Sequence, residues 1–404
     1  MNLLYTITAY PPSIGGAQAH FHELARRLAQ RHRLQVAAHW FETRTDWLLG
    51  TTLTAPRAQA VGPLDGVPRH QLALSTGERL LAAPFVASYY VAKGLAIACL
   101  SNLLLTHLEP VADGLDLVHN GRVGREGLSF ASQKLARRLD VPFVLTPFHH
   151  PRWTGWNYRH YIDLYRRADA VIALTEAEKQ ELIRLGVEAR RIFVTGMGPI
   201  LAGSPCPEAF RRRYDLHGPI VLFLGQKYRY KGVSTLLQAA PLVWARVPDA
   251  HLVFIGPRTR HSEFLFARHA ERRILELGGV DLQTKTDALA ASTLLCLPST
   301  QESFGAVFTE AWMLEKPVIG GKTPAVSEII DEGVDGYLVE QDPAALAERI
   351  IYLLEHPRIG EEMGRQGKRK TVARYTWQRL ARRTEEIYET ILRGSTGSRS
   401  EPPF

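Results

Sequence analysis

Short apolar segments alternate with segments of helical periodicity along almost the whole chain, and the alternation occurs twice. The first series of apolar, β-prone runs lies at residues 3–10, 34–40, 116–120, 141–150, 169–175 and 191–196. The second lies at residues 220–225, 251–256, 280–285, 294–299 and 316–321. Strands separated by helices favour a parallel sheet that helices cover on both faces. We therefore expect an α/β fold of two Rossmann-like, doubly wound parallel-sheet domains that face a central cleft.

A segment rich in proline and glycine, residues 197–219, separates the two series and has the composition of an interdomain linker. We place an N-terminal domain at residues 1–199 and a C-terminal domain at residues 200–375. An amphipathic helix is expected at residues 376–393, packing back toward the N-terminal domain. Residues 394–404 have the composition of a disordered tail.

Composition narrows the class of protein. The 404 residues carry a net charge of +8 and are 45% hydrophobic, which is typical of a globular protein of two or three domains. This small excess of positive charge allows an anionic partner such as a nucleotide phosphate but does not indicate a nucleic-acid binder. Three widely spaced cysteines, Cys99, Cys206 and Cys296, exclude a disulfide framework and a CxxC motif. The N-terminal segment lacks a secretory pattern, so we expect a cytoplasmic protein.

Residues 80–108 form a long apolar stretch in which Lys93 is the single formal charge. Its length would allow it to cross a bilayer. Pro84, Gly94 and several polar side chains interrupt it. We expect buried or interfacial helices of a globular domain rather than a membrane span.

Two glycine-containing loops follow predicted strands, which is where ligands bind in open parallel sheets. Gly15 and Gly16 would let backbone N–H groups at a helix start approach a phosphate or a sugar, although an ordinary tight turn explains them equally well. The loop at residues 225–232 holds Lys227, Arg229 and Lys231. Three cations at a helix entrance suit phosphates, with a solvated basic loop as the alternative.

Glu302 and Glu310 flank a Phe304-Gly305 pair. Glu302 follows the predicted strand at residues 294–297, and Glu310 lies in the early turns of the next helix, so both carboxylates can face one cleft. A carboxylate accepts two hydrogen bonds and suits vicinal sugar or ribose hydroxyls. Backbone N–H groups near Gly305 would favour an anion. The alternative is a solvated glutamate pair.

His149 and His150 end the predicted strand at residues 141–150. A histidine at this position could contact a sugar or transfer a proton. Adjacent side chains on an extended chain point in opposite directions, so we expect one of the two to face the ligand.

Together these features resemble glycosyltransferase family 4, the retaining nucleotide-sugar transferases of GT-B fold. The resemblance covers nearly the whole chain and includes the Glu302-Ser303-Phe304-Gly305 motif followed by Glu310-Ala311. Its other parts are the Gly15-Gly16 loop, Arg167-Ala168-Asp169-Ala170, Lys231-Gly232, Lys316-Pro317-Val318-Ile319 and Asp335-Gly336-Tyr337-Leu338-Val339.

The resemblance implies that the N-terminal domain binds the acceptor and the C-terminal domain binds the nucleotide sugar. Glu310 would hold the ribose hydroxyls and Glu302 the hydroxyls of the donor sugar. Ser303, Phe304 and Gly305 would contact sugar or phosphate. Lys231 would stabilise the departing diphosphate. It implies no metal ion and no cofactor, because cationic side chains and helix dipoles neutralise the charge.

The remaining donor contacts implied are Gly15 and Gly16 in the N-terminal domain and Gln226 and Lys227 in the phosphate loop. Gln226 departs from the family, whose members often carry an arginine there, and either Lys227 or Arg229 would supply the missing charge.

The family's cleft histidine corresponds to His149 or His150. We favour His150.

The leading functional hypothesis is transfer of a hexosyl group from a UDP- or GDP-sugar to a hydroxyl of a cell-surface glycan or lipid-linked precursor, with retention. Alternatives of the same fold are a nucleotide-sugar epimerase and a sugar phosphorylase. A third is a non-catalytic binder of anionic polymers or membranes. Because Arg26, Arg27, Arg31 and Arg33 join the apolar residues 80–108 in the N-terminal domain, we also expect peripheral contact with the inner face of the cytoplasmic membrane.

Overall fold

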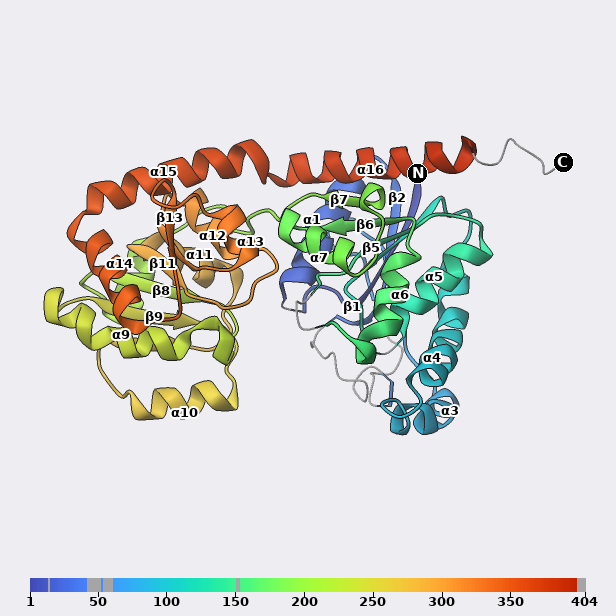
Figure 1. The fold of residues 1–404 in the computed structure, drawn as a ribbon, viewed down its shortest axis with the longest axis horizontal. Helices are drawn as coiled ribbons and strands as arrows, with labels where there is room; N and C mark the ends of the chain where they lie inside the picture. The colour runs from blue at the N-terminus through green and yellow to red at the C-terminus, as the bar shows by residue number, and fades with distance from the viewer. Residues whose placement is uncertain (14, 42–51, 54–60, 126, 150–152, 398–404) are drawn as a thin grey trace. The chain divides into compact units, whose positions relative to one another are not determined.

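The computed structural model describes the chain except for residues 14, 42–51, 54–60, 126, 150–152 and 398–404 (Figure 1). It divides into two compact units. Unit 1 consists of Met1–Gly196 and Trp377–Phe404, and unit 2 consists of Met197–Thr376.

Unit 1 is built on a parallel seven-stranded sheet with the order β3-β2-β1-β4-β5-β6-β7. The strands are β1 (Asn2–Ala9), β2 (Arg33–Trp40), β3 (Arg69–Gln71), β4 (Leu117–Gly121), β5 (Phe143–Thr146), β6 (Ala170–Ala173) and β7 (Ile192–Val194). The helices are α1 (Gly16–Leu28), α3 (Thr76–Ala87), α4 (Lys93–Leu108), α5 (Leu128–Arg138), α6 (Arg159–Arg166), α7 (Glu176–Arg184) and α16 (Trp377–Gly397). Short 3-10 turns are η1 (Glu109–Val111), η2 (Trp156–Tyr158) and η3 (Ala189–Arg191).

Unit 2 is built on a parallel six-stranded sheet with the order β10-β9-β8-β11-β12-β13. The strands are β8 (Ile220–Leu224), β9 (His251–Ile255), β10 (Ile274–Leu277), β11 (Leu294–Leu297), β12 (Val318–Gly321) and β13 (Gly336–Val339). The helices are α8 (Pro207–Tyr214), α9 (Val233–Arg246), α10 (Arg260–Arg268), α11 (Leu282–Ala291), α12 (Ala306–Met313), α13 (Pro324–Ile329), α14 (Pro343–Glu355) and α15 (Pro357–Arg374), with a 3-10 turn η4 (Arg229–Lys231).

Both sheets confirm the expected α/β class and the two Rossmann-like parallel-sheet domains. Every residue of β8 and β11 is buried, because helices cover both faces of a parallel sheet. Strand order reverses between β1 and β4 in unit 1 and between β8 and β11 in unit 2. In doubly wound sheets, the loops on either side of such a switch point form the ligand site. The loops after β8 and β11 are therefore neighbours.

One predicted strand was wrong. Residues 280–285 do not form a strand, and the strand β10 lies earlier, at Ile274–Leu277. Asp281 instead caps the helix α11, because its carboxylate accepts a hydrogen bond from the backbone N–H of Thr284. An aspartate at the N-cap satisfies an orphan helix donor, and this local bond outweighs the β-propensity of the segment.

The apolar residues 80–108 form most of α3 and all of α4. Lys93–Val111 is long and apolar enough to span a membrane by composition, with 39% of its most apolar window buried. One face of α4 lies in the hydrophobic core of unit 1, through Ile97, Leu100, Leu104 and Leu105. The helix is therefore part of a globular core, while other side chains of the same stretch are exposed.

The helix α16 packs on α1 and continues to Gly397, beyond the predicted end at residue 393. Unlike proline, the glycines, serine and threonine at residues 394–397 do not forbid helical backbone angles. A buried hydrogen-bond chain ties α16 to the sheet: the Tyr388 hydroxyl lies 2.6 Å from the Tyr5 hydroxyl and 2.6 Å from His119 Nδ1.

Candidate functional site

The loop between β8 and α9 carries the basic segment of unit 2. Gly232 ends it with φ of 82°, a left-handed conformation that other residues adopt at a cost. A Cβ there would lie 2.7 Å from the carbonyl oxygen of Pro298, so the loop packs directly against the β11 loop. A glycine at this position lets the two loops on either side of the switch point touch.

An ion pair joins the two loops. Lys231 Nζ lies 2.5 Å from Glu302 Oε1, and their side chains are 16% and 9% exposed. The Ser299 hydroxyl donates to the same carboxylate oxygen at 2.8 Å. The sequence predicted both charged residues at this edge, and the structure brings them into contact.

Gln341 was not predicted. Its side-chain amide donates to the carbonyl oxygens of Tyr230 at 2.8 Å and Pro298 at 2.7 Å, one on each loop. It thus holds the loop that carries Lys231 against the loop that carries Glu302. Gln341 follows β13, more than a hundred residues from Tyr230, so no local pattern could reveal this role.

Glu310 is 4% exposed and points into the interior of unit 2. Its Oε1 accepts from Lys285 Nζ at 2.8 Å and from the backbone N–H of Ile200 at 3.3 Å. Its Oε2 is buried and has no hydrogen-bond partner among the residues that the structure describes. Because a buried acceptor without a partner is costly, this oxygen is suited to receive a hydroxyl from a ligand.

Lys285 was also missed by the sequence analysis. Its ammonium bonds Glu310 and the carbonyl oxygen of Ile200 at 2.7 Å, which fixes the carboxylate from α11. The sequence predicts a strand for residues 280–285, which include this lysine, and no partner for it is evident from that prediction.

The N-terminus of α12 lies between Glu302 and Glu310 in the sequence and adds backbone donors to the site. Gly305 is its N-cap with φ of 84°, and no side chain caps the helix. The first backbone N–H groups of a helix lack intrahelical acceptors and favour an anion. Phe304 is 2% exposed and meets the Tyr375 ring edge-on at 5.2 Å, which anchors the segment that also carries Ser303.

The structure directs Lys227 away from the role of phosphate cation. Its ammonium donates to Glu276 at 2.5 Å and to the carbonyl oxygens of Gly256 at 2.6 Å and Leu277 at 2.5 Å. All three of its hydrogens are therefore committed to the strand edge of β9 and β10. Burial lowers the pKa of Lys227, and the Glu276 carboxylate opposes that shift.

Gln226 is half-buried, and Arg229 is exposed at the start of η4. Of the two candidate substitutes for the missing arginine, Arg229 is thus the one with an exposed side chain.

In unit 1, Gly15 is the N-cap of α1 and Gly16 its first residue, so the glycine loop ends at a helix start as predicted. A Cβ on Gly15 would lie 2.2 Å from the Gln18 side-chain oxygen, which shows how closely Gln18 covers it.

His149 is 3% exposed, and its ring meets Tyr165 edge-on at 5.8 Å, so it faces the interior of unit 1. Its backbone N–H donates to Glu178 Oε1 at 2.7 Å. Burial raises the pKa of Glu178 to about 7, although two backbone N–H bonds oppose the shift. His150 lies outside the described residues.

Within unit 2, the chemistry of this site is that of an anionic, hydroxyl-rich ligand. Lys231 and the α12 N-terminus supply positive charge and donors, and Glu302 and Glu310 supply acceptors. A phosphate would match the first set, and vicinal hydroxyls would match the second.

Two family models match the chain. The model described as "Glycosyl transferase 4-like domain" matches residues 15–198, and the model described as "Glycosyl transferases group 1" matches residues 218–356. Together the two matches include Lys231, Glu302 and Glu310.

Curated relatives are similar over part of their length. Phosphatidyl-myo-inositol mannosyltransferase of Mycobacterium tuberculosis is 34% identical over 188 residues, which are 44% of this chain and 49% of that protein. The match therefore spans about half the length of that relative. Alpha-D-kanosaminyltransferase of Streptomyces kanamyceticus is 25% identical over 304 residues, 68% of this chain and 77% of that protein.

Solved structures share the fold. The crystal structure of Anabaena HepE with UDP and glucose has a TM-score of 0.74 at 19% identity and covers 96% of this chain and 100% of that one. WaaG, a glycosyltransferase involved in lipopolysaccharide biosynthesis, has a TM-score of 0.64 at 16% identity, with 99% and 100% covered. With both domain models matched and this fold in common, the chain belongs to the GT-B glycosyltransferases of family 4.

Proposed function

We propose that this protein transfers a hexosyl group from a UDP- or GDP-sugar to a hydroxyl of a glycan or lipid-linked precursor, with retention at the anomeric carbon. The observation that carries the proposal is Glu310, a buried carboxylate with one oxygen fixed by Lys285 and the other open. An open acceptor in a buried site suits the ribose of a nucleotide.

In this proposal Lys231 and the N-terminus of α12 bind the diphosphate. Charge on the leaving diphosphate increases as the bond from the anomeric carbon to its oxygen breaks, and a fixed ammonium stabilises that charge. Glu302 holds hydroxyls of the hexose. Because Lys231 and Glu302 pair with each other in this structure, each stays compensated until the donor arrives.

In unit 1, we propose that the loop after β5 contacts the donor sugar. His150 would contact the sugar, and His149 holds the loop through its buried ring and its bond to Glu178. The glycine loop at Gly15 and Gly16 would bring backbone N–H groups to the donor or acceptor. We further propose that the reaction takes place at the inner face of the cytoplasmic membrane.

The comparisons support the choice of donor class. One similar structure contains UDP-glucose, and a similar curated protein is named as a mannosyltransferase. They do not decide between uridine and guanosine nucleotides, so both donors belong in the test.

The test is calorimetric binding of UDP, GDP and their hexose conjugates, followed by release of nucleoside diphosphate in the presence of hydroxyl acceptors. Anomeric configuration of the product is read by NMR. Positive charge from Lys231 and α12 predicts that activity survives EDTA. Loss on chelation that manganese or magnesium restores would overturn the metal-free site. Conversion of the donor sugar without release of nucleoside diphosphate would favour the epimerase, and a requirement for inorganic phosphate would favour the phosphorylase.

A further inference from the structure

Five large apolar side chains are exposed on α3, on the start of α4 and in the turn between these helices. Leu80 and Leu81 lie on α3, Tyr90 and Val91 in the turn after it, and Leu95 in the first turn of α4. Their exposed fractions are 72%, 68%, 68%, 94% and 60%. We call these five residues the α3–α4 tip. Gathered apolar exposure of this kind marks an interaction surface.

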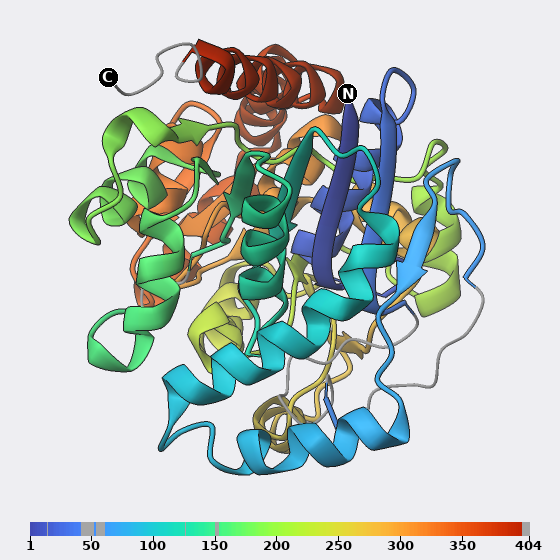
Figure 2. The ribbon, with the colours of Figure 1, turned by 90° about the vertical axis from the view of Figure 1, so that its right-hand side faces the viewer.

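The tip is not needed to build the core. The same helices bury a separate set of side chains, including Ala82, Val86, Ala96 and Ile97, in the core of unit 1. α3 and α4 also lie at the end of unit 1 opposite to α16, as both views show (Figures 1 and 2). The tip therefore points away from the packed body of this unit.

Aromatic and basic side chains border the tip. Lys93 Nζ donates to the carbonyl oxygen of Asn157 at 2.5 Å and lies 5.9 Å from the centre of the Tyr89 ring. Arg125 donates to the Tyr90 hydroxyl at 2.9 Å. Trp156 is 74% exposed and carries Arg159 stacked at 3.5 Å from its ring. Aromatic rings and cations beside exposed aliphatic groups are typical of a surface that enters the headgroup region of a bilayer.

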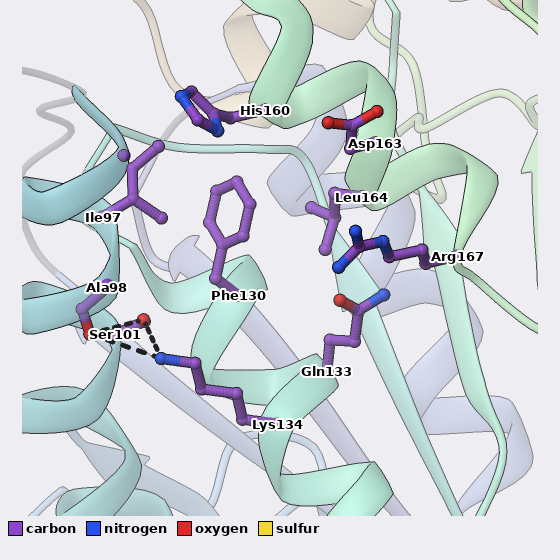
Figure 3. A pocket seen from close by; sticks show the side chains of 11 residues that line it. Ile97, Ala98, Ser101, Phe130, Gln133, Lys134, His160, Asp163, Leu164 and Arg167 are labelled. Carbon is purple, nitrogen blue, oxygen red and sulfur yellow. Dashed lines mark hydrogen bonds between the residues drawn. The ribbon is translucent and has the colours of Figure 1, made fainter.

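A pocket of about 210 Å³ begins beside the tip, at Gly94 and His160, and extends between α4, α5 and α6 (Figure 3). Arg167 is the exposed cation that lines it, and Asp163 is the carboxylate in its wall. Lys134 also lines it, but its ammonium donates to the carbonyl oxygen of Ala98 at 3.3 Å, Ser101 Oγ at 2.7 Å and Asn102 Oδ1 at 2.7 Å, which fixes α5 to α4. Gln133 is 7% exposed, and its side-chain nitrogen is buried without a hydrogen-bond partner among the described residues. A buried unpartnered donor in the same pocket as the Arg167 guanidinium suits a negatively charged oxygen.

We propose that the α3–α4 tip inserts into an anionic lipid bilayer and that the neighbouring pocket takes the phosphate of a lipid headgroup. The apolar side chains would supply affinity for any bilayer, and the pocket would supply preference for anionic lipid. The tip lies within the apolar residues 80–108 that the sequence indicated, but the basic residues beside it are not the arginines named with them. Arg26 and Arg27 pair with Glu23, and Arg31 pairs with Glu385 on α16, so these arginines serve α1 and α16 instead.

The proposal rests on the surface of unit 1 and does not require glycosyl transfer. The test is co-sedimentation of the full chain, without donor, with vesicles of phosphatidylcholine alone and of phosphatidylcholine mixed with phosphatidylglycerol. We expect Val91→Glu and Leu95→Glu each to weaken partitioning into both vesicles by about tenfold, since each removes one apolar side chain that would be buried in the bilayer. Arg167→Gln should lower binding to the anionic vesicles only.

Matched controls are Leu242→Glu, at an apolar side chain of unit 2 that is 47% exposed, and Arg379→Gln, at an exposed arginine on α16. Both should bind vesicles like the unchanged protein. Circular dichroism and nucleotide binding show whether each variant is folded, so a failure of donor binding is recognised separately.

Three results would overturn the proposal. The unchanged chain could fail to sediment with anionic vesicles at low salt, or Val91→Glu and Leu95→Glu could bind like the unchanged chain. Sedimentation velocity could instead show a dimer that Val91→Glu dissociates and no vesicle binding, which would make the tip an interface between two copies.

Discussion

Glu310 is the residue whose environment is hardest to explain without a ligand. It is a buried carboxylate with one oxygen held by Lys285 and the other without a partner in the described part of the chain. We expect Glu310→Ala to weaken binding of the nucleoside diphosphate by about 1.5 to 3 kcal/mol, the range for hydrogen bonds to charged groups. Titration calorimetry measures the affinity of each protein for the nucleoside diphosphate. Glu315→Ala, at an exposed position after the same helix, is the control, and equal affinities for all three proteins would exclude Glu310 from the site.

The two lysines of the basic loop have different roles. Lys231 meets Glu302 at the switch point, whereas Lys227 is fully buried beside Glu276. Lys231→Ala should lower turnover about 100-fold at saturating donor, as for loss of one preorganised electrostatic donor. Lys227→Met should cost about 2 kcal/mol of unfolding free energy, because the Gly256 and Leu277 carbonyl oxygens lose their ammonium donor while the partly buried Glu276 keeps only Arg258. Arg229→Ala should change both quantities little.

Nucleoside diphosphate release and urea unfolding of the three variants separate these effects. Near-normal turnover in Lys231→Ala would reject it as the main cation. Collapse of turnover in Arg229→Ala would show that this arginine replaces the one absent at Gln226.

At the scale of elements, the β8–α9 connection depends on its last glycine. Gly232→Ala places a Cβ 2.7 Å from the Pro298 carbonyl oxygen at a positive φ, and we expect a loss of about 2 kcal/mol in unfolding free energy. Gly278→Ala, where nothing lies within 4 Å of the added carbon, should change stability by less than about 1 kcal/mol. Urea denaturation compares them, and equal stabilities would show that the two loops do not constrain each other.

Most helices and strands were predictable from sequence, because their pattern lies in residues that are neighbours along the chain. Buried parallel strands are continuous apolar runs, so most of them could be located without a structure. The exception at residues 280–285 was decided by a single capping bond from Asp281. The contacts that build the site are different in kind: Glu310 with Lys285, and Gln341 with Tyr230, join residues distant in sequence and appear only when the strand order is known.

At the scale of the whole molecule, the chain crosses between the units twice, after Gly196 and after Thr376. The return of α16 completes the interior of unit 1, where Tyr388 joins Tyr5 and His119. This interior also encloses several histidines. Burial lowers the pKa of His20 to about 3, of His119 to about 3 and of His39 to about 4. All three belong to unit 1.

These groups predict that unit 1 loses stability in acid. Below the ordinary histidine pKa of about 6.5, the unfolded chain binds three protons that the folded unit does not, so stability present above that pH is lost as the pH falls toward 4. Glu178 acts in the opposite direction, because its raised pKa of about 7 makes the folded unit bind a proton between pH 7 and about 4.5. Between pH 6.5 and 4.5 these four groups together contribute a net difference of about two protons, or about 3 kcal/mol per pH unit. Burial also lowers the pKa of His70 and His160 in the same unit, which adds to the difference in the same direction.

Urea unfolding at a series of pH values, with hydrogen exchange to follow unit 1 separately, measures this slope. His20 has no hydrogen-bond partner among the described residues and lies against Phe148 and Trp377. His20→Phe therefore removes one titrating group while keeping an aromatic ring in the cluster. We expect the slope of unit 1 to fall by about 1.4 kcal/mol per pH unit in this variant, because one fewer proton is taken up on unfolding. Identical slopes in the two proteins would show that burial does not shift the pKa of His20 and that this histidine does not contribute to the acid stability.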